Sequence, residues 1–444
     1  MTGAPFRLSV AAIATSTALI SSPAFAQSAK IDAADTAWMI GATSLVLMMT
    51  IPGLALFYAG MVRKKNVLAT MAQCMAATFL VSVLWAIVGY SLTFTGNGVY
   101  IGTLERMFLY GMTLDSISPL AKTIPESLFM VHQMTFAVIT VALVAGSVAD
   151  RLRFSAFLLF CAFWLLLVYV PIAHWVWGGG FLGTYGVIDF AGGLVVHLNA
   201  GIAGLVAAYV VGKRRGYGTE NLAPYDLTLA VIGTGLLWVG WFGFNGGSAL
   251  GANARAAMAI TSTHLAASAG AFTWMALEWS TRGKPSVLGM ISGAVAGLGT
   301  ITPASGFVLP MQGVLIGVIA GGICFWACTW LKLRLGYDDS LDVFGVHGVG
   351  GLTGTFLAGV LAVGALSATP ETPRGVSGLL EGNPHQVLAQ LCGIVVTLLW
   401  SGTLTYVVLK IISAIVPLRV RKEDEVMELD VTQHGLAVAR TSTA

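Results

Sequence analysis

Two short stretches of the sequence, DFAGGLVVH (189–197) and DSLDVFGVH (339–347), each end in a histidine that follows an aspartate by eight positions. Both histidines, His197 and His347, lie inside long apolar segments. A polar ring within an apolar membrane helix is costly, so it indicates a functional site. Two such rings in matched settings indicate a duplicated element. The alternative is that each histidine separately bonds to a backbone carbonyl in a packed bundle.

The composition indicates a membrane protein with many spans. Hydrophobic residues make up 56% of the 444 residues, charged residues only 10%, and the mean hydropathy is +0.83. Soluble domains carry about 25% charged residues. Many of the 54 glycines recur at a spacing that lets helices pack closely, and packing alone is the alternative to any functional role for Gly313-x3-Gly317-x3-Gly321, Gly293-x3-Gly297 and Gly350-x3-Gly354.

Residues 1–26 are predicted to be a signal peptide rather than part of the fold. Arg7 supplies a short positive region, LSVAAIATSTALI (8–20) an apolar one, and Pro23-Ala24-Phe25-Ala26 a cleavage site of the A-x-A type. The mature protein would then begin near Gln27 on the exported side. An uncleaved anchor is the alternative.

Hydrophobic segments long enough to cross an apolar core of about 30 Å recur about eleven times after this peptide. We therefore predict an all-α polytopic membrane protein, with a transmembrane domain over 27–416 and a cytoplasmic tail over 417–444. The predicted spans lie near 36–61, 67–95, 125–148, 154–174, 190–212, 226–243, 256–279, 286–303, 309–331, 342–366 and 386–416.

Basic residues predict the orientation of these spans. One side of the membrane holds Lys30, Arg106, Lys122, Arg255 and Arg374. The other side holds the basic residues that follow alternate spans, which are Arg63, Lys64, Lys65, Arg151, Arg153, Lys213, Arg214, Arg215, Arg282, Lys284, Lys332, Arg334, Arg419, Arg421, Lys422 and Arg440. Loops rich in lysine and arginine stay in the cytoplasm. We expect a bacterial inner membrane, with the N-terminus periplasmic and the C-terminus cytoplasmic.

The two histidine segments run in opposite directions in this topology. Asp189 opens the fifth span from outside, whereas Asp339 precedes the tenth from the cytoplasm. This relation is typical of inverted-topology repeats, here about 36–212 and 226–366, with the span at 386–416 as an extra helix. The substrate path of such folds lies near the midplane, where the repeats meet. We therefore expect His197 and His347 to face each other across a pseudo-twofold axis.

Four ordered motifs carry a resemblance to a known family. They are DFAGGLVVHLNAGIAG (189–204), WVGWFGFNGGS (238–248), ADRLRFS (149–155) and DVFGVHGVG (342–350). With these motifs, the chain from its first span to its tail resembles the bacterial ammonium transporters of the ammonium transporter/methylammonium permease/Rhesus family. The resemblance implies a homotrimer in membrane lipid that carries ammonium, with methylammonium as an alternative substrate, and that uses no cofactor.

The resemblance assigns the external ammonium site to Phe136, Trp177 and Ser248. It assigns a stacked gate below that site to Phe136 and Phe244. The chemistry suits a small cation, because each aromatic face attracts it by ~0.5–2 kcal/mol and a hydroxyl supplies an acceptor, whereas a buried carboxylate would hold it too tightly. The alternative is that these aromatic residues form an interfacial belt or a packing core.

Below the gate, stripping water from a permanent cation is prohibitive in a low dielectric. Potassium cannot escape that cost, whereas ammonium can leave a proton behind and cross as ammonia. A neutral pair of His197 and His347, each ring with one N–H and one acceptor, would line this path. The resemblance implies that the proton travels separately along the twin histidines, so that uptake moves net charge.

Two aspartates and a third histidine complete the predicted site. Asp189 and Asp339 receive structural or electrostatic roles; Asp189 is expected to cap its span and to order the outer vestibule, with direct ammonium contact as the alternative. His132 stands one helical turn before Phe136, where relatives often carry an aromatic residue, and is a candidate modulator of the outer site. If it participates, uptake should weaken as the external pH falls through the histidine range. The alternative is a spectator at the outer rim.

Other chemistry lacks support in the sequence. The cysteines all lie within predicted spans, so no disulfide framework is implied. No H-E-x-x-H motif, metal-ligand histidine spacing or phosphate-binding loop occurs, so we predict neither a metal site nor an enzyme. The net charge of +3 is explained by topology and gives no case for nucleic acid. The cysteines are Cys74, Cys161, Cys324, Cys328 and Cys392.

The tail after Pro417 is the one substantial polar segment. A charge run is usually a solvated face, but Leu429-Asp430-x3-His434-Gly435 resembles the regulatory tail of the family. That tail docks under the pore, couples neighbouring subunits and lies near the surface that a PII-type signalling protein contacts. Glu428 replaces a common glycine and Leu436 a common acidic residue, and both weaken the case for tight coupling.

Three functions from different classes follow from these observations. An ammonium transporter is favoured. An ammonium sensor that signals through its tail would keep the outer site but need no working pore. An intramembrane metalloenzyme that uses the paired histidines is the third, and metal analysis of the purified protein would exclude it.

Overall fold

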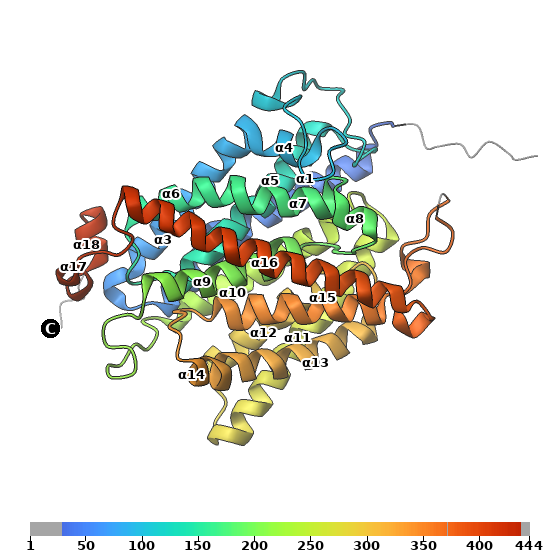
Figure 1. The fold of residues 1–444 in the computed structure, drawn as a ribbon. Helices are drawn as coiled ribbons and strands as arrows, with labels where there is room; N and C mark the ends of the chain where they lie inside the picture. Colours follow the sequence, from blue (N-terminus) through green and yellow to red (C-terminus); the bar gives the residue numbers. More distant parts are fainter. Residues whose placement is uncertain (1–28, 371, 437–444) are drawn as a thin grey trace, which may run out of the picture.

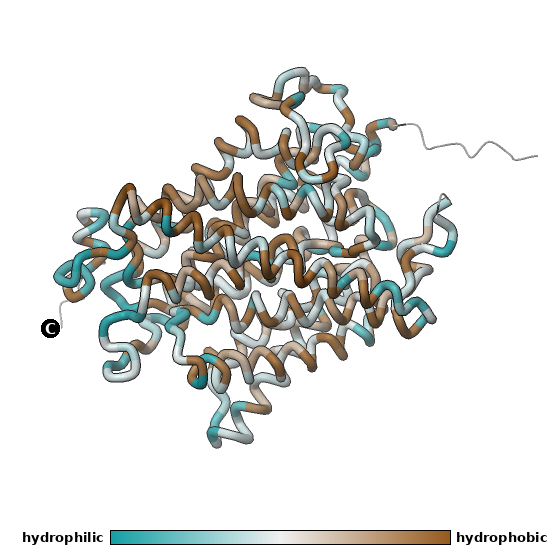
Figure 2. Tube along the Cα trace, viewed as in Figure 1, coloured by the Kyte–Doolittle hydropathy of each residue, from teal (hydrophilic) through white to brown (hydrophobic). Residues whose placement is uncertain are grey.

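The described part of the chain is a bundle of helices. The computed structural model describes residues 29–370 and 372–436; the predicted signal peptide and the end of the tail lie outside this range. Over these residues the chain forms helices and no strand. Figure 1 shows long helices packed side by side, with the two tail helices at one end. Apolar residues line the middle of the bundle and polar residues gather in the loops at its ends (Figure 2). This distribution suits a protein surrounded by lipid.

Each predicted span corresponds to one helix or to a run of successive helices. In the first half these are Ala33–Met48, Met49–Leu54 and Ala55–Met61 (α1, η1, α2), Val67–Leu84, Trp85–Gly89 and Tyr90–Phe94 (α3, η3, α4), Glu126–Ala145 and Gly146–Val148 (α5, η5), Phe154–Trp164, Leu165–Tyr169, Val170–Trp177 and Phe181–Tyr185 (α6, η6, α7, α8), and Gly193–Leu198 and Asn199–Val211 (η7, α9).

In the second half they are Leu227–Trp241 and Phe242–Gly246 (α10, η8), Ala254–Arg282 (α11), Val287–Ile301 (α12), Pro310–Trp326, Ala327–Leu331 and Lys332–Leu335 (α13, η9, α14), Phe344–Gly348 and Val349–Leu361 (η10, α15), and Pro384–Ile415 (α16). Two short helices follow in the tail, Lys422–Val426 (α17) and Leu429–His434 (α18).

The predicted all-α polytopic fold is confirmed. Over the described residues, nine helical runs are long and apolar enough to cross a membrane. Helix α12 is apolar but shorter, with 15 residues, and α11 is long but is not among the nine. The count of eleven spans and the orientation of the termini stay predictions.

The two histidine segments run antiparallel through the bundle. Just before η7, the Phe190 N–H donates to the carbonyl of Pro303 (3.1 Å), and the Val363 N–H, just after α15, donates to that of Phe307 (2.8 Å). The rings of Phe190 and Phe307 lie 5.9 Å apart. At the other end, Asp338 before η10 bonds to Arg214 after α9. The start of each segment therefore lies at the end of the other.

Glycines bring these two segments together at the level of the histidines. Gly201 follows His197 by four residues, and a side chain there would collide with the backbone of Gly348. Gly351 follows His347 by four residues, and a Cβ there would lie 2.7 Å from the backbone nitrogen of Leu198. Because small residues allow backbones to approach closely, the matched glycines let the two histidine turns pack directly against each other.

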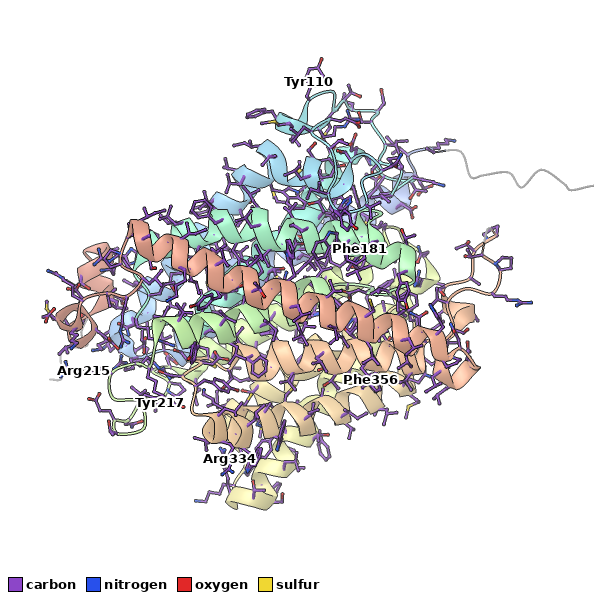
Figure 3. All side chains as sticks on the ribbon, viewed as in Figure 1. Tyr110, Phe181, Arg215, Tyr217, Arg334 and Phe356 are labelled. Atoms are coloured by element: carbon purple, nitrogen blue, oxygen red, sulfur yellow. The ribbon has the colours of Figure 1, made fainter. Side chains whose placement is uncertain are left out.

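We call the end of the bundle that carries α17 and α18 the tail end, and the opposite one the far end. Arg215, Tyr217 and Arg334 lie towards the tail end (Figure 3). Tyr110 projects from the loop between α4 and α5, away from the bundle (Figure 3), and the residue is 80% exposed. The buried core runs between these ends and includes Phe136, Trp241 and Phe244.

Candidate functional site

A cavity of about 300 Å³ lies at the far end, and we call it the vestibule cavity. Its lining includes Phe136 from α5, Trp177 from α7 and Ser248 just after η8. The structure thus brings together the three side chains predicted to recognise ammonium. Asp189 and His132 line the same cavity.

Phe136 lies at the centre of the aromatic groups in this cavity. Its ring centroid is 5.8 Å from that of Trp177, with the two planes at 89°. The His132 ring lies 5.1 Å away in an edge-on arrangement. Phe244 stacks on Phe136 at 4.2 Å and 21°, and both phenyl rings are buried. Phe136 lines the vestibule cavity and Phe244 lines the next cavity inward, so the stacked pair separates the two.

Hydrogen bonds orient two polar groups in the wall of the vestibule cavity. The Ser248 hydroxyl donates to the carbonyl of Phe244 (2.8 Å), which leaves its oxygen lone pairs free to accept. The indole Nε1 of Trp177 donates to the carbonyl of Asp189 (2.8 Å). This hydrogen bond fixes the orientation of the indole through its N–H group. The Trp177 ring remains part of the cavity wall.

The carboxylate of Asp189 is occupied by backbone donors. It accepts from the N–H groups of Gly192 (2.9 Å), Gly193 (2.6 Å), Leu194 (2.8 Å) and Val195 (3.1 Å). A carboxylate has about four lone-pair sites, so these four bonds fill it. Burial raises the pKa of Asp189 above its ordinary value, and the four bonds act in the opposite direction. The geometry is that of a helix cap and leaves little capacity for a ligand.

Asp339 is bonded differently from Asp189. One of its carboxylate oxygens accepts from the Phe344 N–H (2.7 Å), and the other has no hydrogen-bond partner among the described residues. The Lys332 ammonium donates to the backbone carbonyl of Asp339 (2.6 Å) and to the Asp342 carboxylate (2.7 Å). The two aspartates therefore occupy matching sequence positions without making matching bonds.

The two histidines lie in contact at the middle of the bundle. Their Nδ1 atoms are 3.3 Å apart, and the rings are nearly parallel at 16° with centroids 5.3 Å apart. His197 is 1% exposed and His347 is 4% exposed. Each histidine lies in a π-helical turn, η7 or η10. Trp241 stacks on His197 at 5.4 Å and 21°, a contact that the sequence analysis did not assign.

A narrow void lies beside the histidine pair, and we call it the lumen. Its volume is about 10 Å³, close to the minimum of about 10–15 Å³ that one water molecule requires. His197 and His347 supply its polar lining, and the other walls are apolar or aromatic, including Phe244, Trp241 and Val295.

A third cavity of about 270 Å³, the tail-side cavity, lies on the other side of the lumen and shares Phe57, Val295 and His347 with it. The vestibule cavity, the lumen and the tail-side cavity therefore follow one another. The lumen, with room for one small molecule, lies between two wide cavities, and the stacked rings of Phe136 and Phe244 separate it from the vestibule cavity.

Comparison with known proteins identifies the family. A sequence model described as the Ammonium Transporter Family matches residues 37–439. The chain belongs to the Ammonium Transporter Family. The family predicted from the four sequence motifs is therefore confirmed. By its name, this is a family of membrane transporters rather than of enzymes.

Relatives of known sequence or structure agree with this assignment. The chain is 47% identical over 419 residues to the ammonium transporter of Aquifex aeolicus, which covers 94% of this chain and 96% of that one. Among solved structures, it is similar to Saccharomyces cerevisiae Mep2, with a TM-score of 0.84 and 37% identity over 93% of each chain. It is also similar to a structure called Sensor Amt Protein, with a TM-score of 0.81 and 28% identity over 90% of this chain and 98% of that one.

The vestibule cavity is also lined by a positively charged side chain, Arg255, which the sequence analysis did not assign to the site. The Arg255 guanidinium lies 4.8 Å from the ring centroid of Phe190 and 4.5 Å from that of Phe307. Its Nε donates to the carbonyl of Gly306 (2.8 Å). The sequence predicts only a topological role for Arg255, because nothing in the local sequence indicates that two phenylalanines from other segments enclose it.

The tail packs against the base of the bundle. The Asp430 carboxylate accepts from the N–H groups of Leu68 (3.1 Å) and Ala69 (2.7 Å) in the first turn of α3. The His434 ring lies 4.8 Å from that of Phe154 at the start of α6. A carboxylate at a helix N-terminus is favourable, so this helix of the tail caps a helix of the bundle instead of forming a solvated charge run.

Proposed function

We propose that the protein takes up ammonium across the bacterial inner membrane by separating it into ammonia and a proton. Ammonium binds in the vestibule cavity and loses a proton. Ammonia then crosses the lumen, while the proton travels along His197 and His347. Uptake therefore moves net charge. The observation that carries this proposal is the lumen of about 10 Å³ beside two contacting histidines, between two wide cavities.

Recognition in the vestibule cavity rests on aromatic faces and one hydroxyl. The rings of Phe136 and Trp177 attract a cation by about 0.5–2 kcal/mol each. The Ser248 oxygen accepts a hydrogen bond, because its own hydrogen is engaged by Phe244. Since the carboxylate of Asp189 is filled by backbone donors, recognition does not depend on a free negative charge that would trap the ion.

The stacked rings of Phe136 and Phe244 act as the gate in this proposal. With centroids 4.2 Å apart they leave no passage, so at least one ring must turn for each molecule that crosses. Such a turn is a local side-chain motion and requires no domain motion. The stacked rings therefore keep water out of the lumen between transport events, and they open when a molecule crosses.

Selectivity follows from the walls of the lumen. A hydrated potassium ion does not fit a void of about 10 Å³, and a bare ion would lose its hydration in apolar surroundings at great cost. Ammonia is neutral and pays no such cost. In the 3.3 Å contact of the two Nδ1 atoms, one nitrogen must donate and the other accept, so the pair supports the transfer of one proton between rings.

The orientation in the membrane and the partners of the protein follow, in this proposal, from its family and from the distribution of its basic residues. The positive-inside rule puts the tail end in the cytoplasm and the vestibule cavity in the periplasm. As in the sequence analysis, we propose a homotrimer whose tail receives a PII-type signalling protein. The contacts of Asp430 and His434 support a docked tail as the platform for such a partner.

An ammonium sensor is the second candidate, because one of the similar structures is called Sensor Amt Protein. The two functions differ in whether the pore conducts. Proteoliposomes holding the purified protein on a solid-supported membrane should give a transient current after an ammonium jump and none after an equal potassium jump. Ammonium binding without any current would reject uptake with net charge movement and favour the sensor. Equal currents for both ions would reject the selective lumen.

A further inference from the structure

His132 is a buried side chain of the vestibule cavity that the proposed transport cycle does not yet use. It is 1% exposed, and its Nδ1 lies 3.2 Å from the hydroxyl oxygen of Thr43 in α1. Its other ring nitrogen, Nε2, has no hydrogen-bond partner among the described residues. Buried polar atoms nearly always have a partner. An unpartnered nitrogen at the wall of a binding cavity therefore points to a ligand.

The position of this nitrogen is set by the residue before Ser248. A Cβ at Gly247 would lie 2.9 Å from Cε1 and 3.3 Å from Nε2 of His132. The edge of the imidazole that carries the unpartnered nitrogen therefore packs against the turn that carries the Ser248 hydroxyl. The same ring meets Phe136 edge-on at 5.1 Å. The unpartnered nitrogen, the hydroxyl and the central aromatic ring belong to one cavity.

We propose that Nε2 of His132 is a second hydrogen-bond acceptor for ammonium, beside the hydroxyl of Ser248. This inference rests on the ammonium uptake proposed above. Every hydrogen of ammonium is a donor, and each loses a water acceptor when the ion enters the cavity. Aromatic faces compensate the charge but supply no conventional acceptor. With Asp189 filled by backbone donors, His132 supplies one of the missing acceptors.

The contact with Thr43 suits the tautomer that this proposal requires, because a hydroxyl can accept from Nδ1 as well as donate to it. A neutral imidazole carries its hydrogen on one nitrogen. When Nδ1 donates to Thr43, Nε2 presents its lone pair to the cavity and attracts the cation. The opposite tautomer would direct an N–H dipole at the cation. Among the described residues, Thr43, Phe136 and Gly247 surround the ring and no carboxylate bonds to it, so its surroundings favour the neutral form.

An imidazole acceptor makes the vestibule cavity selective for cations that carry N–H groups. Aromatic faces attract any small cation, so they distinguish poorly between ammonium and potassium. Hard metal cations prefer oxygen ligands, whereas an imidazole nitrogen is a good acceptor for an N–H donor. Methylammonium has one donor fewer than ammonium. His132 should therefore favour ammonium over methylammonium as well as over alkali ions.

Two substitutions test the acceptor against simple packing. His132→Phe keeps a ring of similar size without an acceptor, and His132→Gln keeps an acceptor without the ring. We expect the phenylalanine variant to need about tenfold more ammonium for half-maximal current, because it loses a hydrogen bond to an ion. We also expect this variant to lose its preference for ammonium over methylammonium. The glutamine variant should stay close to the wild type. Unchanged half-saturation in His132→Phe, or equal losses in both variants, would overturn the acceptor role.

A measurement on the unaltered protein makes the test independent of folding. The protein with ¹⁵N-labelled histidines is reconstituted in lipid and titrated with ammonium, with potassium as the control ion. One ¹⁵N resonance of an imidazole nitrogen without a hydrogen should shift with ammonium and not with potassium. The same resonance should be absent from the spectrum of His132→Gln. No such shift would overturn the proposal. If the wild type gave no ammonium current at all, the transport function would fail, whereas an intact current with no effect of His132 would reject this inference alone.

Discussion

The Nδ1 atoms of His197 and His347 lie 3.3 Å apart between two rings inclined by only 16°. The two residues are 150 positions apart in the chain. They meet because their segments run antiparallel and because Gly201 and Gly351 let the backbones approach. A hydrogen bond at this distance requires one nitrogen with a hydrogen and one without, so the two rings differ at Nδ1 when they are bonded to each other.

Removal of both imidazoles should abolish the ammonium current. In the variant His197→Ala/His347→Ala, the lumen keeps its apolar walls but loses its proton path. The measurement is the transient current of proteoliposomes after an ammonium jump, with the amount of inserted protein determined for each sample. A double-alanine protein that carries wild-type current would reject the relay.

A carboxylate in the place of one histidine should change the selectivity of the path. His347→Asp puts a polar, water-recruiting group beside the lumen, so a hydrated cation no longer meets an apolar barrier alone. We expect partial ammonium conduction together with a new potassium current. The double-alanine protein serves as the control for the loss of the ring. An aspartate variant still closed to potassium would show that Phe136 and Phe244 set selectivity above the histidines.

Loss of an aromatic face should weaken ammonium recognition. Phe136→Ala and Trp177→Ala each remove a cation–π contribution of about 0.5–2 kcal/mol, which corresponds to a two- to thirtyfold increase in half-saturating ammonium. Phe181→Ala is a suitable control, because Phe181 packs on Trp175 and Tyr100 instead of lining the vestibule cavity. Unchanged half-saturation in both test variants would place recognition elsewhere.

Asp189 and Asp339 should differ strongly as stability determinants. Asp189→Ala leaves four backbone N–H groups without their acceptor, whereas Asp339→Ala removes the acceptor of one. Each buried unpaired donor costs about 1–3 kcal/mol, so the apparent Tm in detergent should fall much further for Asp189→Ala. Similar melting temperatures for the two variants would contradict the capping role.

The docking of the tail should weaken in mild acid. Burial lowers the pKa of His434 below its ordinary value of 6.5, an effect that Asp430 partly opposes. The docked state therefore favours the neutral ring, and its stabilisation is full above pH 6.5 and declines as the pH falls below it. Burial raises the pKa of Asp430 above its ordinary value of 3.8, so protonation of that carboxyl opposes this trend only in stronger acid.

Hydrogen exchange of residues 422–436 at pH 7.5 and pH 5.5 measures this docking. Exchange should be faster at the lower pH in the wild type. His434→Phe keeps a ring against Phe154 but cannot be protonated, so its exchange protection should not change between the two pH values. The same pH response in both proteins would assign the effect to another group.

A protein that ends after Val420 should insert and conduct but lose its response to a PII-type partner. This end point keeps the hydrogen bonds of Leu418 and Val420 to Arg153 and Arg151 and removes α17 and α18. Binding of the partner is measured by pull-down with detergent-solubilised protein. The point variant Asp430→Asn, which weakens the cap on α3, is expected to bind less tightly than the wild type. Undiminished binding to the truncated protein would confine recognition to the loops.

The sequence by itself determined the helical membrane fold, the approximate bounds of its helices and the importance of the two histidine segments. Hydropathy acts over consecutive residues, so a run such as 386–416 identifies a helix without reference to any other part of the chain. The matched spacing of Asp189 and His197 with Asp339 and His347 was likewise visible in the sequence.

Only the tertiary structure decided how the polar atoms of these segments are used. Asp189 and Asp339 have the same spacing, yet one is filled with four bonds and the other accepts one, because the local backbone differs. The free nitrogen of His132 depends on Thr43, which is 89 residues away. Hydrogen bonds and ring contacts require positions accurate to a fraction of an ångström, and such positions arise only when distant helices pack.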